Sequence, residues 1–311
     1  MTPEHHDTHA GTPDIPGPAP SPPVGEASRS ADPRPAGVHS PPPGTRAVDL
    51  DIEVPGTPEE VWEAVASGPG ITAWFVPAKV EGRVGGTVEL DFGPGLGVET
   101  AQVTAWDPPR RFAAEVAASE GRPPFAMEWL VEARDGGTCV VRLINSGFGH
   151  GAEWDAEFDA TESGWRLFLR NLRLYLTHFP GQRCTSVLVN GHAAGPVPAA
   201  FGALVAALGL PEGAAEGDKV AASASGVPPL AGVAELRTDG VLALLLDEPA
   251  SGIGFVAAEP AGDGSAHTSV YLYLFGDGAA EVAAREEPAW RAWMGRHFPM
   301  PEPPAAEPAG G

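Results

Sequence analysis

The chain has 311 residues, 43 % of them hydrophobic, and a formal net charge of −22 at pH 7. This length is enough for two domains of ordinary size, each with its own core. The negative charge argues against non-specific binding to nucleic acid or to an acidic membrane surface, because both are polyanions. Cys139 and Cys184 are the only cysteines, too few for a disulfide framework and wrongly spaced for a zinc site.

The two ends of the chain differ from its middle in composition. Residues 1–44 hold twelve prolines and no aromatic residue, and PEPPAAEPAGG follows Met300. Such segments bury too little apolar surface to offset the entropy of ordering the backbone, so we expect disordered tails over 1–44 and 300–311. The N-terminus lacks the charged-then-apolar order of a secretory signal, and no apolar stretch reaches the length of a membrane span. We therefore expect a cytoplasmic protein.

The first ordered elements are a strand and a short helix. Apolar residues alternate with polar ones over 48–54, which predicts a strand with one buried face. Thr57, Pro58 and Glu60 then form the pattern of a capping box with proline at the first helical position. The helix carries Val61, Trp62 and Val65 on one stripe, and the Gly-Pro-Gly at 68–70 is expected to end it.

Between residues 84 and 145, short β-type runs alternate with turn signals. The runs are GTVELDF, GVETAQVTAW, RRFAAEVA, FAMEWLVEA and TCVVRLIN. Turns at Gly-Pro-Gly, Asp-Pro-Pro and Asp-Gly-Gly separate them. This succession of hairpins predicts an antiparallel sheet.

A long amphipathic helix is predicted after the sheet, over Ser163–His178. Its apolar stripe follows the 3.6-residue period. The stripe consists of Trp165, Phe168, Leu169, Leu172, Tyr175, Leu176 and Phe179. The segment stops at His-Phe-Pro, which is typical of a helix terminus with histidine near its negative end. Burial of this stripe against the predicted sheet would make the helix the main element that closes the core of the first domain.

The order of these segments resembles the family of activator-of-heat-shock-protein-ninety-ATPase homologues, a branch of the START-like (SRPBCC) superfamily. The resemblance covers about residues 48–180. Four segments carry it: TPEEVWEAV with the following WF, DPPRRF, LINSGF, and ESGWRLFLRNLRLYL. It implies an α+β helix-grip fold, in which an antiparallel sheet wraps a long C-terminal helix. The superfamily also contains aromatase/cyclases and lipid-transfer proteins.

A second, degenerate copy of this unit is predicted over 184–299. WRAWMGRHFP repeats the tryptophan start and the His-Phe-Pro end of the long helix, with six fewer residues between them. SVLVNGHAAGPVPAAFGALVAAL echoes the first strand, turn and proline-started helix. The domain organisation is therefore a tail, a START-like domain over 45–180, the second unit and a second tail. The alternatives for the second unit are an unrelated α+β domain or strands that extend the first sheet.

No catalytic constellation stands out in the sequence. It has no phosphate-binding glycine loop, HExxH, GxSxG or CxxC, so we expect no metal and no cofactor, and a non-catalytic role is favoured. Glu128 and Glu132 are expected on the solvated face of their strand. His150 precedes the long helix, where a cavity mouth lies in a helix-grip fold, and is the candidate polar contact.

The aromatic content of the first unit is the remaining functional signal. An aromatic-lined cavity under the long helix would suit a flat or lipid-like apolar molecule. The predicted lining residues are Trp74, Phe75, Phe92, Trp106, Phe112, Trp129, Trp154, Phe158, Phe168 and Leu172. We therefore predict binding of a small apolar molecule. The alternatives are a packed core without a cavity, a co-chaperone that binds a chaperone as the resemblance implies, and a cyclase or dehydratase acting on an aromatic substrate.

Overall fold

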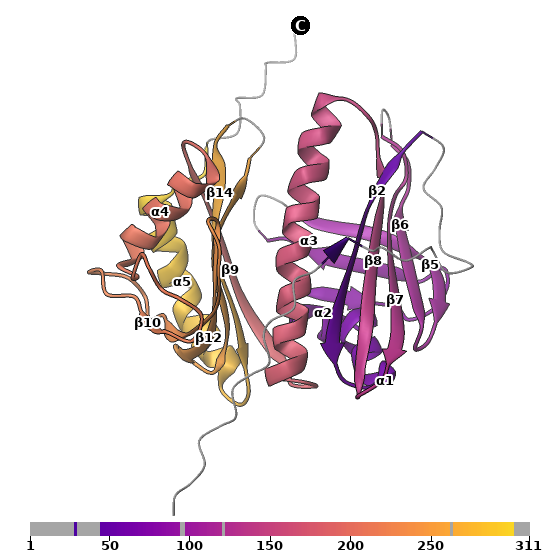
Figure 1. Ribbon diagram of the computed structural model, residues 1–311, viewed down its shortest axis with the longest axis horizontal. Coiled ribbons are helices and arrows are strands. Elements are labelled where there is room, and N and C mark those ends of the chain that lie inside the picture. The colour runs from indigo at the N-terminus through magenta and orange to yellow at the C-terminus, as the bar shows by residue number, and fades with distance from the viewer. Residues whose placement is uncertain (1–27, 30–43, 94–96, 120–121, 262–263, 302–311) are drawn as a thin grey trace, which may run out of the picture.

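The computed structural model describes residues 28–29, 44–93, 97–119, 122–261 and 264–301 (Figure 1). The predicted tails fall almost entirely outside these ranges. Strand β1 (Ser28–Arg29) is an exception, because it pairs antiparallel with β2 and so adds a strand where the sequence predicted only a tail. In the part of the chain that the structure describes, every helix is too short or too polar to span a bilayer.

The first unit is an eight-stranded antiparallel sheet with three helices. Its strand order is β1-β2-β8-β7-β6-β5-β4-β3, so the second strand pairs with the last and the others form a meander. The strands after β1 are β2 (Arg46–Pro55), β3 (Ala78–Val80), β4 (Thr87–Asp91), β5 (Val98–Asp107), β6 (Arg111–Val116), β7 (Phe125–Arg134) and β8 (Thr138–Phe148). The helices are α1 (Pro58–Ala66), α2 (Gly68–Thr72) and α3 (Ala152–His178).

The capping box predicted for the first helix is present. The backbone N–H of Glu60 donates to Thr57 Oγ1 over 3.3 Å, and that of Thr57 donates to Glu60 Oε2 over 2.8 Å. The helix α1 ends at Ala66, as the glycines predicted. The Gly-Pro-Gly segment itself begins α2 instead of forming only a turn, because Ser67 caps this second short helix.

Helix α3 is longer than the sequence predicted. It begins at Ala152 rather than Ser163 and has 27 residues, about 40 Å of helix. The added N-terminal turns carry many charged residues and only two large apolar ones, Trp154 and Phe158, so the apolar stripe is sparser there than in the predicted segment. The predicted end is confirmed: Phe179 N–H donates to Tyr175 O over 2.8 Å after the last helical residue.

The second unit repeats the strand order of the first with two fewer strands, and it has one helix fewer. Its sheet runs β10-β11-β12-β13-β14-β9, so its first strand again pairs with its last. The strands are β9 (Cys184–Ala193), β10 (Lys219–Ala221), β11 (Ala231–Arg237), β12 (Val241–Glu248), β13 (Gly252–Pro260) and β14 (Ala266–Phe275). The helices are α4 (Val197–Leu208) and α5 (Ala279–His297). The second His-Phe-Pro also ends a helix, with Phe298 N–H donating to Met294 O over 2.7 Å. The α+β helix-grip fold is thus present twice.

The second sheet is buried on both faces, which the sequence did not predict. Figure 1 shows α3 between the two sheets, with α4 and α5 on the far side of the second sheet. Alternate residues of β13 and β14 therefore enter different cores. Phe255, Tyr273 and Phe275 join the core around α3, whereas Val256 and Leu272 join the core under α4 and α5.

Helix α3 is consequently buried on more than its predicted stripe. Phe275 stacks on Phe179 with ring centroids 4.2 Å apart and on Tyr175 at 5.8 Å. Leu167 and Leu174 lie off the stripe but are also buried in the same core. The second sheet supplies the surface that covers this side of the helix.

Candidate functional site

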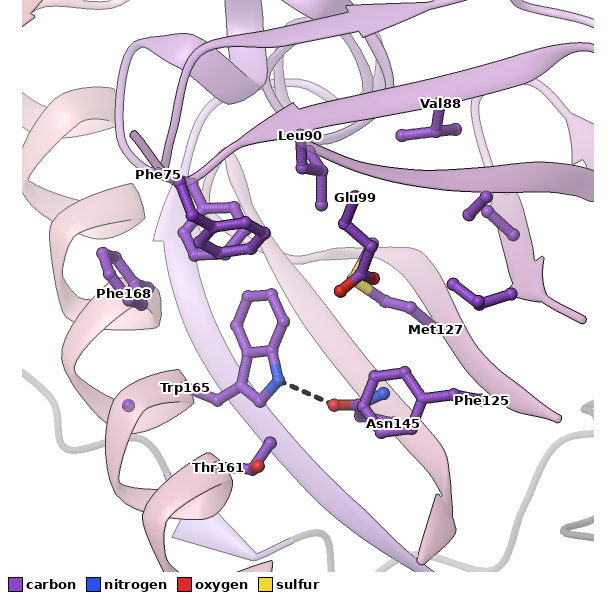
Figure 2. A pocket seen from close by; sticks show the side chains of 15 residues that line it. Phe75, Val88, Leu90, Glu99, Phe125, Met127, Asn145, Thr161, Trp165 and Phe168 are labelled. Atoms are coloured by element: carbon purple, nitrogen blue, oxygen red, sulfur yellow. Dashed lines mark hydrogen bonds between the residues drawn. The ribbon is translucent and has the colours of Figure 1, made fainter. Parts of the chain in front are cut away.

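A cavity of about 260 Å³ lies between the first sheet and α3 (Figure 2). Its lining comes from the segment after α2, from strands β4 to β8 and from the middle of α3. The lining residues are Phe75, Val88, Leu90, Phe92, Glu99, Ala101, Ala114, Val116, Phe125, Met127, Asn145, Thr161, Gly164, Trp165 and Phe168. The cavity is thus mainly apolar and contains few polar side chains.

Small side chains opposite one another leave the space open. Gly164 and Thr161 lie on α3, and Ala101 and Ala114 lie on β5 and β6. Larger side chains at these four positions would occupy the volume between helix and sheet. The cavity therefore results from side-chain size at these positions within an otherwise close-packed core.

Aromatic rings form the wall between the cavity and the second unit. Phe75 is central: its ring lies 4.6 Å from that of Phe168, 4.9 Å from that of Trp165 and 5.8 Å from that of Phe92. These tilted and edge-to-face arrangements are the ones that aromatic pairs prefer. They present ring faces and edges to whatever occupies the cavity.

The second unit supports this aromatic wall. Tyr273 Oη donates a hydrogen bond to the backbone carbonyl of Phe75 over 2.7 Å, and Tyr271 stacks on Phe168 at 6.4 Å. Burial raises the pKa of Tyr273 well above its ordinary value, so its hydroxyl stays protonated and can donate. A smaller cavity of about 90 Å³ lies on the far side of the wall, between Phe92, Phe168 and the two tyrosines.

Two polar groups of the cavity already have partners. Trp165 Nε1 donates to Asn145 Oδ1 over 2.9 Å (Figure 2). Asn145 Nδ2 donates to the carbonyl of Ala126 over 3.0 Å. The Asn145 amide therefore orients the indole and is held in turn by β7. Its main role is to fix the wall of the cavity.

Glu99 is the ionisable residue of the lining. It lies on β5 directly opposite Leu90 of β4, and Figure 2 shows its carboxyl group projecting into the cavity. Glu99 is itself exposed, so the cavity opens to solvent beside it. Desolvation by the surrounding apolar side chains raises the pKa of Glu99.

The predicted lining residues fall into several environments. Phe75, Phe92 and Phe168 line the cavity, and Trp154 lines a neighbouring groove. The others that pack in the core without lining the cavity are Trp74, Phe112, Trp129 and Leu172. Trp106 packs against Trp62 at 5.1 Å, and Phe158 lies under the guanidinium of Arg46 at 4.3 Å. The prediction thus selected large aromatics without distinguishing a core position from a cavity wall.

Two predictions about polar residues need correction. His150 is exposed in the loop before α3 and lies outside the lining. Glu128 is buried, with 2 % of its surface exposed, and forms an ion pair with Arg111, so it does not lie on a solvated face. Arg111 of the neighbouring strand covers this carboxylate, a contact that the alternation within one strand cannot reveal. Glu132 is exposed, as predicted.

Sequence reasoning missed Glu99, Asn145 and Thr161. A signal existed for Glu99, because the alternation of its strand places it on the same face as Ala101 and Val103. Among the described residues, no group of three or more histidine, cysteine, aspartate or glutamate side chains could hold a metal ion.

Comparison with known proteins finds a matching family model and several similar solved structures. Residues 55–177 match the family model described as Activator of Hsp90 ATPase homolog 1-like protein. No curated protein sequence matches the chain. Solved structures of low sequence identity also match the chain.

CalU16 from Micromonospora echinospora is 19 % identical over 45 % of this chain and 82 % of its own, with a TM-score of 0.37. The Aha1 dimer from Colwellia psychrerythraea is 19 % identical over 42 % of this chain and 96 % of its own, with a TM-score of 0.36. DynU16, from the dynemicin biosynthetic locus, is 18 % identical over 80 % of this chain and 95 % of its own, with a TM-score of 0.38.

Proposed function

We propose that the first unit, of which residues 55–177 match the family model described as Activator of Hsp90 ATPase homolog 1-like protein, uses the helix-grip cavity to bind a small apolar molecule. One observation carries this proposal: a cavity of about 260 Å³ with a mainly apolar and aromatic lining lies beneath α3. Such concave, largely apolar sites with a few placed polar groups are typical of small-molecule binding.

The size and shape of the cavity favour a compact, flat ligand. Binding pockets of drug-sized molecules run from about 300 to 1,000 Å³, so this cavity lies just below that range. Phe75, Trp165 and Phe168 offer ring surfaces against which a planar molecule can stack. A fused two-ring hydrocarbon skeleton is therefore a suitable probe.

The test is to fill the cavity with a side chain and measure the binding of naphthalene by isothermal titration calorimetry. Ala101→Phe places a ring in the cavity, and Ala133→Phe adds the same ring at an exposed position of β7. We expect Ala101→Phe to weaken binding at least about tenfold and Ala133→Phe to leave it unchanged. Equal binding by both variants, or no binding by the parent protein, would contradict the proposal.

An enzymatic role on an aromatic substrate is a second candidate, and Glu99 favours it. A carboxyl group with a raised pKa inside an apolar cavity is suited to proton transfer. A cyclase or dehydratase of this design would depend on Glu99, whereas the exposed His150 lies outside the lining. Turnover of an aromatic substrate by His150→Ala but not by Glu99→Gln is the expected pattern.

The family description suggests a third role, the stimulation of a chaperone ATPase. This role concerns an outer surface and is independent of the cavity. It is tested by adding the full chain to a chaperone of the same source and measuring ATP hydrolysis. An unchanged rate at saturating protein would remove this candidate.

A further inference from the structure

Glu99 occupies a position where the fold calls for an apolar residue. Its side chain shares one face of β5 with those of Ala101, which lines the cavity, and Val103, which is 1 % exposed in the core. Its cross-strand neighbour on β4 is Leu90, another lining residue. Glu99 is exposed at the opening of the cavity, and its apolar neighbours remove only part of its hydration, which costs some folding free energy unless a partner compensates it.

No described residue compensates this carboxylate. Neither a hydrogen bond nor an ion pair to Glu99 is formed by the residues that the structure describes. The side-chain amide of Asn145, which also lines the cavity, is already engaged: it donates to the carbonyl of Ala126 and accepts from Trp165. Glu99 is therefore a hydrogen-bond acceptor that is open to a molecule in the cavity.

The described lining of the cavity carries no positive charge. Among the described residues that line it there is no lysine, arginine or histidine. Arg122 lies in the adjoining groove, which shares Glu99, but its guanidinium binds both carboxylate oxygens of Glu157 at 3.2 and 2.7 Å. An anionic ligand group in the cavity would thus face a carboxylate without a cation to offset the repulsion.

Building on the function proposed above, we infer that the ligand is an apolar ring molecule bearing a hydrogen-bond donor, a hydroxyl or amino group, that donates to Glu99. The same geometry discriminates against carboxylic acids, whose anions would meet Glu99 at close range. Hydrogen bonds to charged groups are stronger than those between neutral groups, so a single donor has a measurable effect on affinity. Free fatty acids are accordingly poor ligands of this cavity.

The experiment compares ligands that share one skeleton. Dissociation constants of naphthalene, 2-naphthol and 2-naphthoate are measured by calorimetry at pH 8 for the full-length parent protein and for Glu99→Gln. Glu115→Gln is the matched control, because Glu115 lines a different pocket, on the outer side of the sheet, and its substitution removes the same charge. Comparing ratios of dissociation constants between proteins cancels the different hydration of the ligands.

We expect the parent protein to prefer 2-naphthol over 2-naphthoate by at least tenfold. In Glu99→Gln this ratio should shrink severalfold, because 2-naphthoate gains affinity and 2-naphthol loses it. Glu115→Gln should keep the parent ratio. The melting temperature of Glu99→Gln, measured alongside, should equal or exceed that of the parent.

The outcomes separate this inference from the function on which it rests. If naphthalene binds and Ala101→Phe abolishes binding, but Glu99→Gln leaves the naphthol-to-naphthoate ratio unchanged, only the inference about Glu99 is overturned. A preference for 2-naphthoate that disappears in Arg122→Gln would overturn it as well. If none of the three ligands binds the parent protein, both proposals are overturned.

Discussion

The two helix-grip units differ in what separates the sheet from its C-terminal helix. In the first, the sheet and α3 enclose a cavity of about 260 Å³. In the second, Trp290, Trp293 and Met294 of α5 fill the corresponding region and are at most 1 % exposed. One strand topology thus supports a cavity in one unit and a closely packed core in the other.

Side-chain size on one helix face accounts for much of this difference. Helix α3 presents Thr161 and Gly164 to its cavity, whereas α5 presents two indole rings to its sheet. Helix length adds to it, because α5 has 19 residues where α3 has 27. Topology alone is therefore a poor guide to function, and the residues between sheet and helix decide it.

The largest loss of stability is predicted for the removal of an indole from the packed core of the second unit. Trp293→Ala should lower the free energy of unfolding by about 3–5 kcal/mol, because it leaves a large cavity in a close-packed region. Phe92→Ala is the matched change at the wall of the existing cavity and should cost clearly less, since Phe92 is only half-buried. Urea unfolding followed by circular dichroism measures both, and equal losses would break the comparison.

A smaller loss of stability should follow when the hydrogen bond between the second unit and the aromatic wall is removed. Tyr273→Phe removes the hydrogen bond to the Phe75 carbonyl in a buried site, so we expect a loss of about 1–3 kcal/mol. Naphthalene should also bind more weakly, because Phe75 is the central ring of the wall. Tyr271→Phe is the control: it removes a part-buried hydrogen bond to Asn190 and should cost less. Identical behaviour of the two variants would show that the second unit does not support the wall.

The equivalent histidines at the ends of α3 and α5 predict a difference in acid sensitivity. Burial lowers the pKa of His178 below its usual 6.5, so the unfolded chain binds a proton more readily than the native protein does. Stability should therefore fall as the pH drops below about 6.5, and His178→Gln should reduce this loss. His297→Gln should change the unfolding free energy less, because its side chain is exposed. Urea titrations between pH 5 and 8 provide the measurement.

The smallest change in stability is expected for the substitution of Glu99. Its native pKa is raised above the usual 4.5, so the native protein binds its proton more readily than the unfolded chain, and ionisation as the pH rises lowers stability. Glu99→Gln should therefore raise the melting temperature at pH 7, and the gain should vanish near pH 4. A lower melting temperature at pH 7 would mean that the carboxylate has a stabilising partner.

Local patterns in the sequence predicted the elements that depend on neighbouring residues. The capping box at Thr57, the alternating strand before it and the end of α3 at His178 all follow from spacings of a few residues. The resemblance then supplied the helix-grip arrangement of the first unit. These features required no knowledge of which distant segments meet.

The missed features depend on contacts between segments that lie far apart in the chain. Glu128 is buried by Arg111 of the neighbouring strand β6, and the N-terminal turns of α3 carry only two large apolar residues. The second sheet covers a second side of α3, and Leu167 and Leu174, which lie off the predicted stripe, are buried. The cavity itself depends on small residues from α3, β5 and β6 meeting at one place, which no single segment reveals.

The position of α3 between two sheets limits which truncations and substitutions the chain can tolerate. A gene fragment ending after Pro180 would encode a helix with apolar residues on two sides but a sheet for only one of them. Rings such as Phe179 would lose the partners that β14 supplies. A substitution of an α3 residue that packs on β14, such as Tyr175, therefore changes the packing between the two units as well as that within the first.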